Sequence, residues 1–256
     1  PKNIGSGGEE IKLQATLSEE VSIEPQAIDL DIVYEDHSIL VVNKPAGLVV
    51  HPGAGNSSGT MANALLHHDP SLRSVPRVGI VHRLDKGTSG LLVVAKQLQS
   101  HINLVEQLQQ REVSRKYIAL AHGEIIAGGT VNTAIGRHPV DRKRMAVISS
   151  GKPAITHYRV RQRYKACTLL DVQLETGRTH QIRVHMAHLH NPLVGDAVYG
   201  GKIKTTNDLN RSKLAQFPRQ ALLAASLAFK HPDDQRVCEW SVPIPEDFQQ
   251  LLNVLE

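Results

Sequence analysis

Apolar residues recur in short runs through residues 39–95, and each run ends near glycine, proline or a charged residue. Runs of this length between turn residues predict strands. We expect these strands at Ile39–Val42, Leu48–Val50, Gly79–Val81 and Leu91–Ala95. Between the second and third run, Thr60 precedes Met61, Ala64 and Leu65 at helical spacing, which predicts a short helix with Thr60 as its cap.

The second half of the chain continues this pattern. Ser100–Arg111 is apolar at Ile102, Val105 and Leu108, which predicts an amphipathic helix. We expect further strands at Lys116–Ala121, Ala154–Arg163, Thr168–Leu174, Ala221–Phe229 and Val237–Val242, and further helices from Arg178-Thr179 and from Pro245. Because the strands come in groups with few helices between them, the pattern predicts an α+β fold with a mixed, largely antiparallel sheet.

The first residues follow a different pattern. Gly5–Gly8 and Glu9–Leu13 predict one turn and one short strand, and an acidic, proline-containing stretch then continues to Asp36. We interpret residues 1–26 as the tail of an incomplete N-terminal module with its linker, and residues 27–256 as the main domain.

Composition narrows the class of protein. Of the 256 residues, 41% are hydrophobic and 21% are charged, as in an ordinary globular protein. No apolar run reaches the roughly 18 residues of a membrane helix, and no signal peptide opens the chain. Cys167 and Cys238 lie far apart without a pairing motif, which suits a reducing compartment. We therefore expect a cytoplasmic protein that does not associate with membranes.

Charge is distributed unevenly around a net value of +4. Residues 1–36 hold two Lys against nine Asp or Glu, whereas residues 137–165 hold nine Lys or Arg against the single Asp141. The basic stretch includes Arg137, Arg142, Lys143 and Arg144. Such a stretch fits either a polyphosphate ligand or a solvated charged face, and composition leaves both readings open.

The usual cofactor motifs are missing. No Gly-x-Gly-x-x-Gly follows a strand, and no Gly-x-Ser-x-Gly occurs. Gly195–Lys202 resembles a phosphate loop but is one residue too long and lacks a following Ser or Thr. A metal hydrolase remains an alternative, because His180, His185, His188 and His190 crowd one segment, although no carboxylate lies among them.

Two segments concentrate chemically active side chains. The loop His82–Gly90, between two apolar runs, carries His, Arg, Asp, Lys, Thr and Ser. In Leu174–His185, Arg178, Gln181 and His185 share helical spacing near an apparent helix N-terminus, where anions bind readily, and Arg183 lies on a different helical face. Either segment alone is a weak signal, and together they indicate a polar site.

The two segments belong to a longer series of motifs in one order along the chain. The series is Asn43–Gly47, His51-Pro-Gly53, His82-Arg-Leu-Asp85, Arg115-Lys-Tyr117, Gly177-Arg-Thr-His-Gln-Ile-Arg183, Pro192–Asp196 with Tyr199-Gly200, and His231-Pro232. From about Ile28 to the C-terminus the chain resembles the A, C and D types of pseudouridine synthase that modify large-subunit ribosomal RNA. Val50–Asn56 and Gly151–Tyr158 are most similar to the synthase D subgroup. Gly87, where an acidic residue is common, and Leu223, where a His is common, depart from the family pattern.

The resemblance implies a mixed, largely antiparallel sheet with flanking helices and a central catalytic cleft. It implies that Asp85 is the catalytic carboxylate, acting as nucleophile or base. Arg183 is then the cation that keeps Asp85 ionised, Tyr117 the aromatic platform for a flipped uracil, and Arg83 the side chain that enters the vacated space in the RNA. The basic residues named above would contact the RNA backbone.

The resemblance also implies the partners. The substrate would be 23S rRNA, free or in a large-subunit precursor, with the stem-loop called helix 69 as target and large-subunit maturation as the process. No cofactor and no metal would be needed, and we expect a monomer. The start of the chain would be the last part of an S4-type RNA-binding module. A non-catalytic RNA-binding protein is the main alternative, but it leaves a carboxylate loop unexplained, because a carboxylate repels phosphate.

Overall fold

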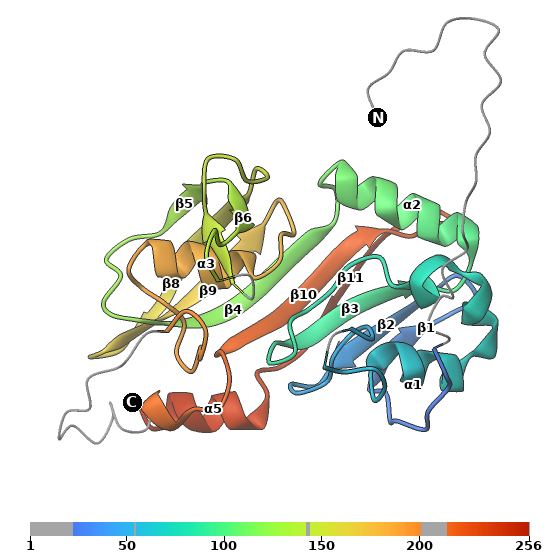
Figure 1. The fold of residues 1–256 in the computed structure, drawn as a ribbon, viewed down its shortest axis with the longest axis horizontal. Helices are drawn as coiled ribbons and strands as arrows, with labels where there is room; N and C mark the ends of the chain where they lie inside the picture. Colours follow the sequence, from blue (N-terminus) through green and yellow to red (C-terminus); the bar gives the residue numbers. More distant parts are fainter. Residues whose placement is uncertain (1–22, 54, 142–143, 201–213, 256) are drawn as a thin grey trace, which may run out of the picture.

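The computed structural model describes residues 23–53, 55–141, 144–200 and 214–255. Within this part of the chain, one nine-stranded sheet has the order β1-β2-β3-β10-β4-β9-β8-β5, and β11 pairs with β10 (Figure 1). All neighbours pair antiparallel except β3 and β10, which are parallel. The predicted α+β class with a mixed, largely antiparallel sheet is therefore confirmed.

The strands and helices have the following bounds. The strands of the large sheet are β1 (Ile32–Glu35), β2 (Ile39–Lys44), β3 (Ser89–Ala95), β4 (Ser114–His122), β5 (Gly129–Asn132), β8 (Ile155–Arg163), β9 (Cys167–Leu174), β10 (Leu222–Lys230) and β11 (Val237–Ser241). A second sheet pairs β6 (Ile135–Arg137) with β7 (Met145–Val147). The helices are α1 (Met61–His68), α2 (Leu98–Gln109), α3 (Gln181–His188) and α5 (Glu246–Asn253).

The strands β2 and β3 are buried on both faces, which explains why their sequences are continuous apolar runs. Leu40 and Val42 pack in the main core cluster, which also contains side chains of α1 and α3. Ile39 and Val41 point to the opposite face and pack in the cluster that contains Leu104 of α2. The centre of the sheet is therefore a rigid support with helices on both sides.

Two predicted strands are not strands in the structure. Leu48–Val50 makes only an isolated bridge, Val49 with Thr60, because the chain turns there to enter α1. Gly79–Val81 follows a 3-10 helix, Pro76–Gly79, in which Arg77 and Val78 have positive φ angles. Ile80 then makes a single bridge with Val94. Both segments are buried apolar turns, which short apolar runs do not distinguish from strands.

The helix predictions need smaller corrections. Thr60 does cap α1, through a capping box with Asn63. In α2, Ile102 is predicted on the apolar face but is 50% exposed, and the buried positions are Ser100, Leu104 and Gln107. The helix expected from Arg178-Thr179 begins at Gln181 instead, since its N-cap, His180, has a left-handed backbone with φ 57°.

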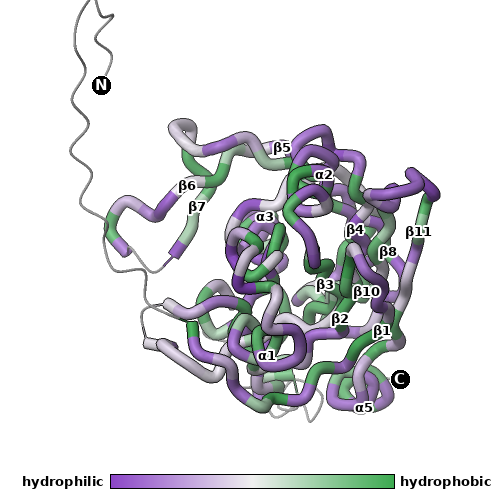
Figure 2. The backbone as a smooth tube through the Cα atoms, turned by 90° about the vertical axis from the view of Figure 1, so that its right-hand side faces the viewer, coloured by the Kyte–Doolittle hydropathy of each residue, from purple (hydrophilic) through white to green (hydrophobic). Residues whose placement is uncertain are grey.

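Four short strands are not predicted by the sequence pattern. They are β1, at the end of the acidic, proline-containing stretch, and β5, β6 and β7. The β6–β7 hairpin lies at one side of the molecule in Figure 2, and its Met145 and Val147 pack against a small cluster that contains Val184 of α3 and Tyr199. Short strands with few apolar residues carry no readable alternation, so pairing with a neighbour defines them.

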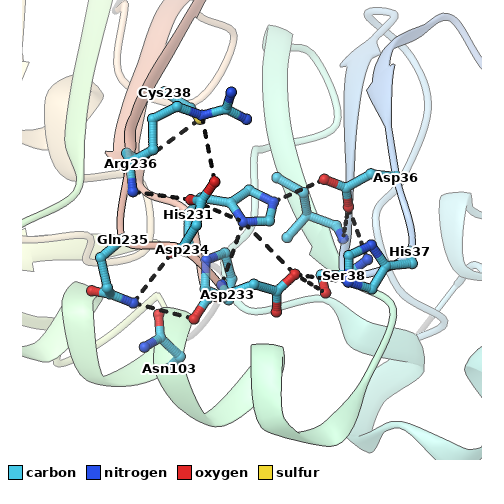
Figure 3. A network of polar contacts seen from close by, with 12 residues as sticks. Asp36, His37, Ser38, Asn103, His231, Asp233, Asp234, Gln235, Arg236 and Cys238 are labelled. Carbon is cyan, nitrogen blue, oxygen red and sulfur yellow. Dashed lines mark hydrogen bonds and ion pairs between the residues drawn. The ribbon is translucent and has the colours of Figure 1, made fainter.

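A polar network joins the β1–β2 turn to the β10–β11 turn (Figure 3). His231, 4% exposed, holds Asp36 through Nε2 and Oδ2 at 2.8 Å. Asp233 accepts a hydrogen bond from Ser38 Oγ at 2.6 Å and lies 2.9 Å from His37 Nε2. Because these turns are far apart in the sequence, the network ties the edge strand β1 to the hairpin formed by the last two strands of the chain, β10 and β11.

The chain before β1 already contacts the domain. The side-chain oxygen of Gln26 accepts a hydrogen bond from the amide of Gly59, and its main-chain amide donates to the carbonyl of Asn63. Arg73 donates to the carbonyl of Ile23. The domain boundary at residue 27 stays a prediction, and the strand expected at Glu9–Leu13 lies outside the described residues. In the part of the chain that the structure describes, none of the helices has the length and apolar character needed to cross a membrane.

Candidate active site

The loop that carries Asp85 is fixed by main-chain contacts. The amide of Thr88 donates to the carbonyl of Asp85 at 3.0 Å, and the amide of Gly47 donates to the carbonyl of Lys86 at 2.8 Å. Lys44 is fully buried, and its Nζ donates to the carbonyls of Pro45 (2.7 Å), Leu48 (2.9 Å) and Lys86 (3.3 Å). The turn after β2 therefore holds the residue next to Asp85.

Burial also sets the charge of this lysine. It lowers the pKa of Lys44 to about 8, although the negative charge of Asp85 opposes the shift. The aspartate is therefore near enough to affect the lysine, while all three hydrogen bonds of the ammonium group go to main-chain oxygens. Lys44 acts on the loop and not directly on the carboxylate.

The carboxylate of Asp85 is held by a buried arginine. Arg183 Nη1 donates to Asp85 Oδ2 at 2.9 Å. Its other two donors, Nε and Nη2, form a fork on Asp196 at 2.7 and 2.9 Å. Burial opposes the charge of Arg183, but Asp196 and Asp85 outweigh it and raise the pKa of Arg183 above its ordinary value. The guanidinium thus stays charged and fixed in orientation.

A histidine occupies the other side of Asp85. His180 Nε2 lies 3.8 Å from Asp85 Oδ1, and Nδ1 lies 2.8 Å from the hydroxyl oxygen of Tyr199. Burial lowers the pKa of His180 and so favours its neutral form, although the negative charge of Asp85 opposes this shift. The side-chain amide of Gln181 donates a hydrogen bond to the carbonyl of Ile155 and so fixes the segment that carries His180 and Arg183.

These groups line a cavity of about 560 Å³. Tyr117 of β4 and Leu222 of β10 contribute to its wall, and Arg83 reaches it as an exposed side chain of the loop that carries Asp85. Burial raises the pKa of Tyr117, and Asp85 raises it further, so its hydroxyl stays protonated. The structure therefore brings together Asp85, Arg83, Tyr117 and Arg183, as the sequence predicts.

The cavity is rich in arginine. Besides Arg83 and Arg183, its lining includes Arg77, Arg111, Arg115 and Arg178, against only two acidic residues, Asp85 and Glu175. Glu175 is engaged by Arg111 at 2.7 Å and by His157 at 2.7 Å. Such a surplus of positive charge suits a polyanionic ligand.

The predicted RNA-binding residues lie partly at this site. Arg144 is half-buried and stacks on the Tyr199 ring, with its guanidinium carbon 5.3 Å from the ring centroid. Arg183 lies 5.1 Å from the same ring, and Arg137 is exposed at the end of β6. Arg142 and Lys143 lie outside the described residues. Of the rest of the basic stretch, Arg159, Arg161 and Arg163 lie on β8, where Arg161 pairs with Asp171 at 2.6 Å, and Lys152 and Lys165 lie on either side of that strand.

The four clustered histidines do not form one site. His180 faces Asp85, whereas His185 is buried against Thr156 Oγ1 and the carbonyl of Thr133. His188 and His190 are exposed. Among the described residues no group of three His, Cys, Asp or Glu side chains is placed to hold a metal ion. The arrangement gives no support to the metal-hydrolase alternative.

Several site residues receive no role from the sequence. Asp196 and Tyr199 stand within quoted motifs, but nothing in their spacing shows that they contact Arg183 and His180. In the sequence, Lys44 stands beside a turn like an ordinary surface lysine, whereas in the structure it is fully buried. Only the complete fold places these side chains, because the contacts depend on how the chain turns between the partners and not on their spacing.

A carboxylate held by a buried arginine, in an arginine-lined cavity on a mixed α+β sheet, is typical of an enzyme that uses a nucleophile or base on a polyanionic substrate. The family model described as RNA pseudouridylate synthase matches residues 38–188. The chain belongs to the RNA pseudouridylate synthase family, and is thus an isomerase.

Individual relatives agree with this assignment. The chain is 53% identical over 258 residues to the ribosomal large subunit pseudouridine synthase D of Escherichia coli (strain K12), covering 100% of this chain and 79% of the relative. It is 54% identical to the protein of that name from Xylella fastidiosa (strain Temecula1), with 100% and 78% covered. Among solved structures, human RNA pseudouridylate synthase domain containing 1 is similar, with a TM-score of 0.65, 26% identity, and 93% and 97% covered.

Proposed function

We propose that this chain converts uridines of 23S rRNA to pseudouridine, with Asp85 as the catalytic carboxylate. The names of the relatives support the substrate class. The observation that carries the role of Asp85 is its geometry, because Arg183 holds one oxygen at 2.9 Å while the other faces the cavity side with His180. We further propose that the target lies in helix 69 and that the reaction is part of large-subunit maturation, as the resemblance to the synthase D subgroup suggests.

The other side chains have roles in the same scheme. A uridine inside folded RNA must leave its stack, which costs a few kcal/mol. In the proposal Arg83, exposed at the rim of the cavity, enters the vacated space. The extruded uracil stacks on Tyr117, which returns about 1–3 kcal/mol. Arg183 keeps Asp85 ionised and oriented, while Arg137, Arg142, Lys143 and Arg144 contact the RNA backbone. The enzyme acts as a monomer.

The reaction itself is tested with the Asp85→Asn variant. The exchange keeps the shape and the hydrogen bond from Arg183 but removes the charge, so isomerisation should vanish while RNA binding survives. Tritium release from 5-tritiated uridine in transcribed 23S rRNA measures turnover, and filter binding measures affinity. Retained turnover at even a tenth of the wild-type rate would contradict the assignment of Asp85 as the catalytic carboxylate.

A matched control separates charge removal at the site from charge removal in general. Asp171→Asn changes an exposed aspartate that pairs with Arg161 on β8, away from the cavity. This variant should keep wild-type turnover. Absence of tritium release by the wild-type protein would instead favour the non-catalytic RNA-binding protein.

The target is tested in cells. Pseudouridine mapping of rRNA from a strain without this protein should show loss of modification in helix 69. Wild-type chain should restore it and Asp85→Asn should not. Loss at positions elsewhere in 23S rRNA would contradict the helix 69 target while leaving the reaction intact.

A further inference from the structure

Three arginines are buried in the part of the chain that the structure describes, and one of them differs from the others. Arg183 is 6% exposed, Arg219 is 9% exposed and Arg115 is 7% exposed. Arg183 forks onto Asp196, and Arg219 forks onto Asp247 at 2.6 and 2.9 Å. Arg115 makes no ion pair with a described carboxylate. Its guanidinium is thus a desolvated cation without an anion among the described residues.

The hydrogen bonds of Arg115 are also incomplete. Its Nε is buried without a partner among the described residues, and Nη2 reaches only the main-chain carbonyl of Glu175, at 3.3 Å. The carboxylate of Glu175 is turned away to Arg111 and His157. Burial lowers the pKa of Arg115, as expected for a cation that its surroundings do not compensate. Leaving a charged donor unsatisfied is costly, so such a group marks a place where a ligand completes the arrangement.

The position of Arg115 points to the base and not to the backbone of the RNA. It lies two residues before Tyr117 on β4, so both side chains point to the same side of the strand, and both line the cavity. The charges of Arg115 and of Asp85 both act on the Tyr117 hydroxyl, one lowering and one raising its pKa. Phosphates have other partners at the rim, where Arg77 and Arg83 are exposed.

The family reaction creates negative charge on the base. When the C1′–N1 bond breaks, its electron pair stays with the uracil, which becomes an anion. The new C1′–C5 bond uses an electron pair of the ring, C5 then loses its proton and N1 gains one, so atoms and electrons balance without another reactant. If Asp85 first adds to the ring instead, the ring carries the same extra charge. In each route a fixed cation beside the ring would lower the barrier.

We propose that Arg115 is a catalytic residue that donates to the carbonyl edge of the uracil and stabilises the negative charge on the ring during isomerisation. This inference rests on the proposed function. The absence of a side chain at Gly177 leaves room for the guanidinium, because a Cβ at this position would stand 2.6 Å from Arg115 Nη1. The segment that carries Arg183 therefore also leaves room for a second cation.

The main test is Arg115→Met, which keeps the length and apolar packing of the side chain. Single-turnover rates at saturating RNA should fall about 100-fold, as for the loss of one oxyanion donor. RNA affinity should stay within about threefold, and the melting temperature should not fall, because an unpaired buried charge has been removed. Arg115→Lys should restore part of the rate. Arg161→Met, on the exposed face of β8, should leave rate and affinity unchanged.

Other outcomes would overturn the proposal. An unchanged rate would exclude the role, and a lower melting temperature with a matching loss of active protein would show a structural arginine. A loss of RNA affinity at an unchanged saturated rate would show a phosphate contact. Each of these three outcomes is measured against a wild-type protein that turns over RNA. If the proposed function itself were wrong, the wild type would show no turnover, so the two failures can be told apart.

A second measurement does not depend on the rate of the variant. Free 5-nitrouracil is an anion at neutral pH because its nitro group withdraws electrons, whereas free uracil is neutral. The anion should inhibit the wild type more strongly than uracil, and this preference should vanish in Arg115→Met. Gly177→Ala, which displaces the guanidinium, should reduce the preference too. Equal inhibition of the wild type by both bases would contradict the proposal.

Discussion

Arg183 contacts two carboxylates at once, and the planar fork of a guanidinium makes this possible. Two of its nitrogens hold Asp196, whose side chain is fully buried, and the third holds Asp85. An ammonium group offers a single point charge and cannot keep both contacts in fixed directions. Charge alone is therefore not the property that the site requires at position 183.

We predict that Arg183→Lys lowers single-turnover isomerisation by at least about 100-fold, since Asp85 loses its fixed orientation. The unfolding free energy should fall by about 3 kcal/mol, because Asp196 stays buried with an incomplete partner. Urea unfolding and tritium release measure the two effects.

A matched control is Arg219→Lys, which breaks the fork on Asp247. That carboxylate is 45% exposed and can be hydrated, so the loss of stability should be smaller. Combined with Asp196→Asn, Arg183→Lys should lose less stability than the sum of the single changes. Strict additivity, or wild-type turnover of Arg183→Lys, would contradict the shared network.

At the scale of elements, the sequence is informative where burial repeats along the chain. The runs that form β2, β3 and β9 are buried on at least one whole face, so their hydrophobicity reports their structure directly. The hairpin β6–β7 carries no such pattern, because its strands are only three residues long. The left-handed turn at Arg77 cannot be predicted from the sequence either, since neither Arg77 nor Val78 is a residue type that favours positive φ.

The same distinction applies to the site. Asp85, Arg83, Tyr117 and Arg183 can be found because they stand in motifs that resemble a family, and the structure places them around one cavity. Pairings such as Arg183 of α3 with Asp196 depend on how the chain after the helix folds back onto it in three dimensions. Spacing along the chain contains no information about that meeting.

The network between the β1–β2 and β10–β11 turns gives a prediction on pH. Burial pushes the pKa of Asp36 upward, but amide hydrogen bonds from Ile39 and Ser38, with contacts from Tyr34 and His231, bring it down to about 2. A lowered carboxyl pKa contributes stability that is complete above the unfolded value of about 4 and is lost as pH falls through about 2. The contribution is about 2 kcal/mol.

Asp36→Asn should therefore be less stable than wild type by about 2 kcal/mol at pH 7, and the difference should shrink between pH 4 and pH 2. Urea unfolding over this range measures it. Asp171→Asn, whose carboxylate is 49% exposed, should differ from wild type by less than about 1 kcal/mol throughout. A difference for Asp36→Asn that does not change with pH would show that packing, not charge, holds the turns together.

At the scale of the whole molecule, the fold divides the basic stretch of residues 137–165 into two parts. One part is the β6–β7 hairpin, which lies at one side of the molecule in Figure 2, packs against Val184 of α3, and contacts the Tyr199 ring through Arg144. The other part follows β8, where Arg161 is neutralised by Asp171 and Arg163 donates to the carbonyl of Ile125. The hairpin part is linked to Asp85 through Tyr199 and His180, so in the proposed function it is the part expected to contact the RNA strand.

We predict that changing Arg142, Lys143 and Arg144 together to Ala weakens RNA binding and flattens its salt dependence. Each lost phosphate contact should reduce the slope of log affinity against log salt by about 0.7 to 0.9, so three lost contacts give a change of about 2 to 3. Filter binding at several salt concentrations measures the slope. An unchanged slope would show that the RNA backbone is bound elsewhere.

A second triple variant removes the same charge from the β8 side. Changing Arg159, Arg161 and Lys165 to Ala alters net charge equally, but it affects residues on or just after β8, of which Arg161 is already paired with Asp171. General attraction of RNA by net charge would make the two triple variants equally weak. A direct path of the strand over the hairpin makes the hairpin variant weaker, because counterions are released only where phosphates and cations meet. The comparison therefore tests the route of the RNA to Asp85 and not merely the charge of the protein.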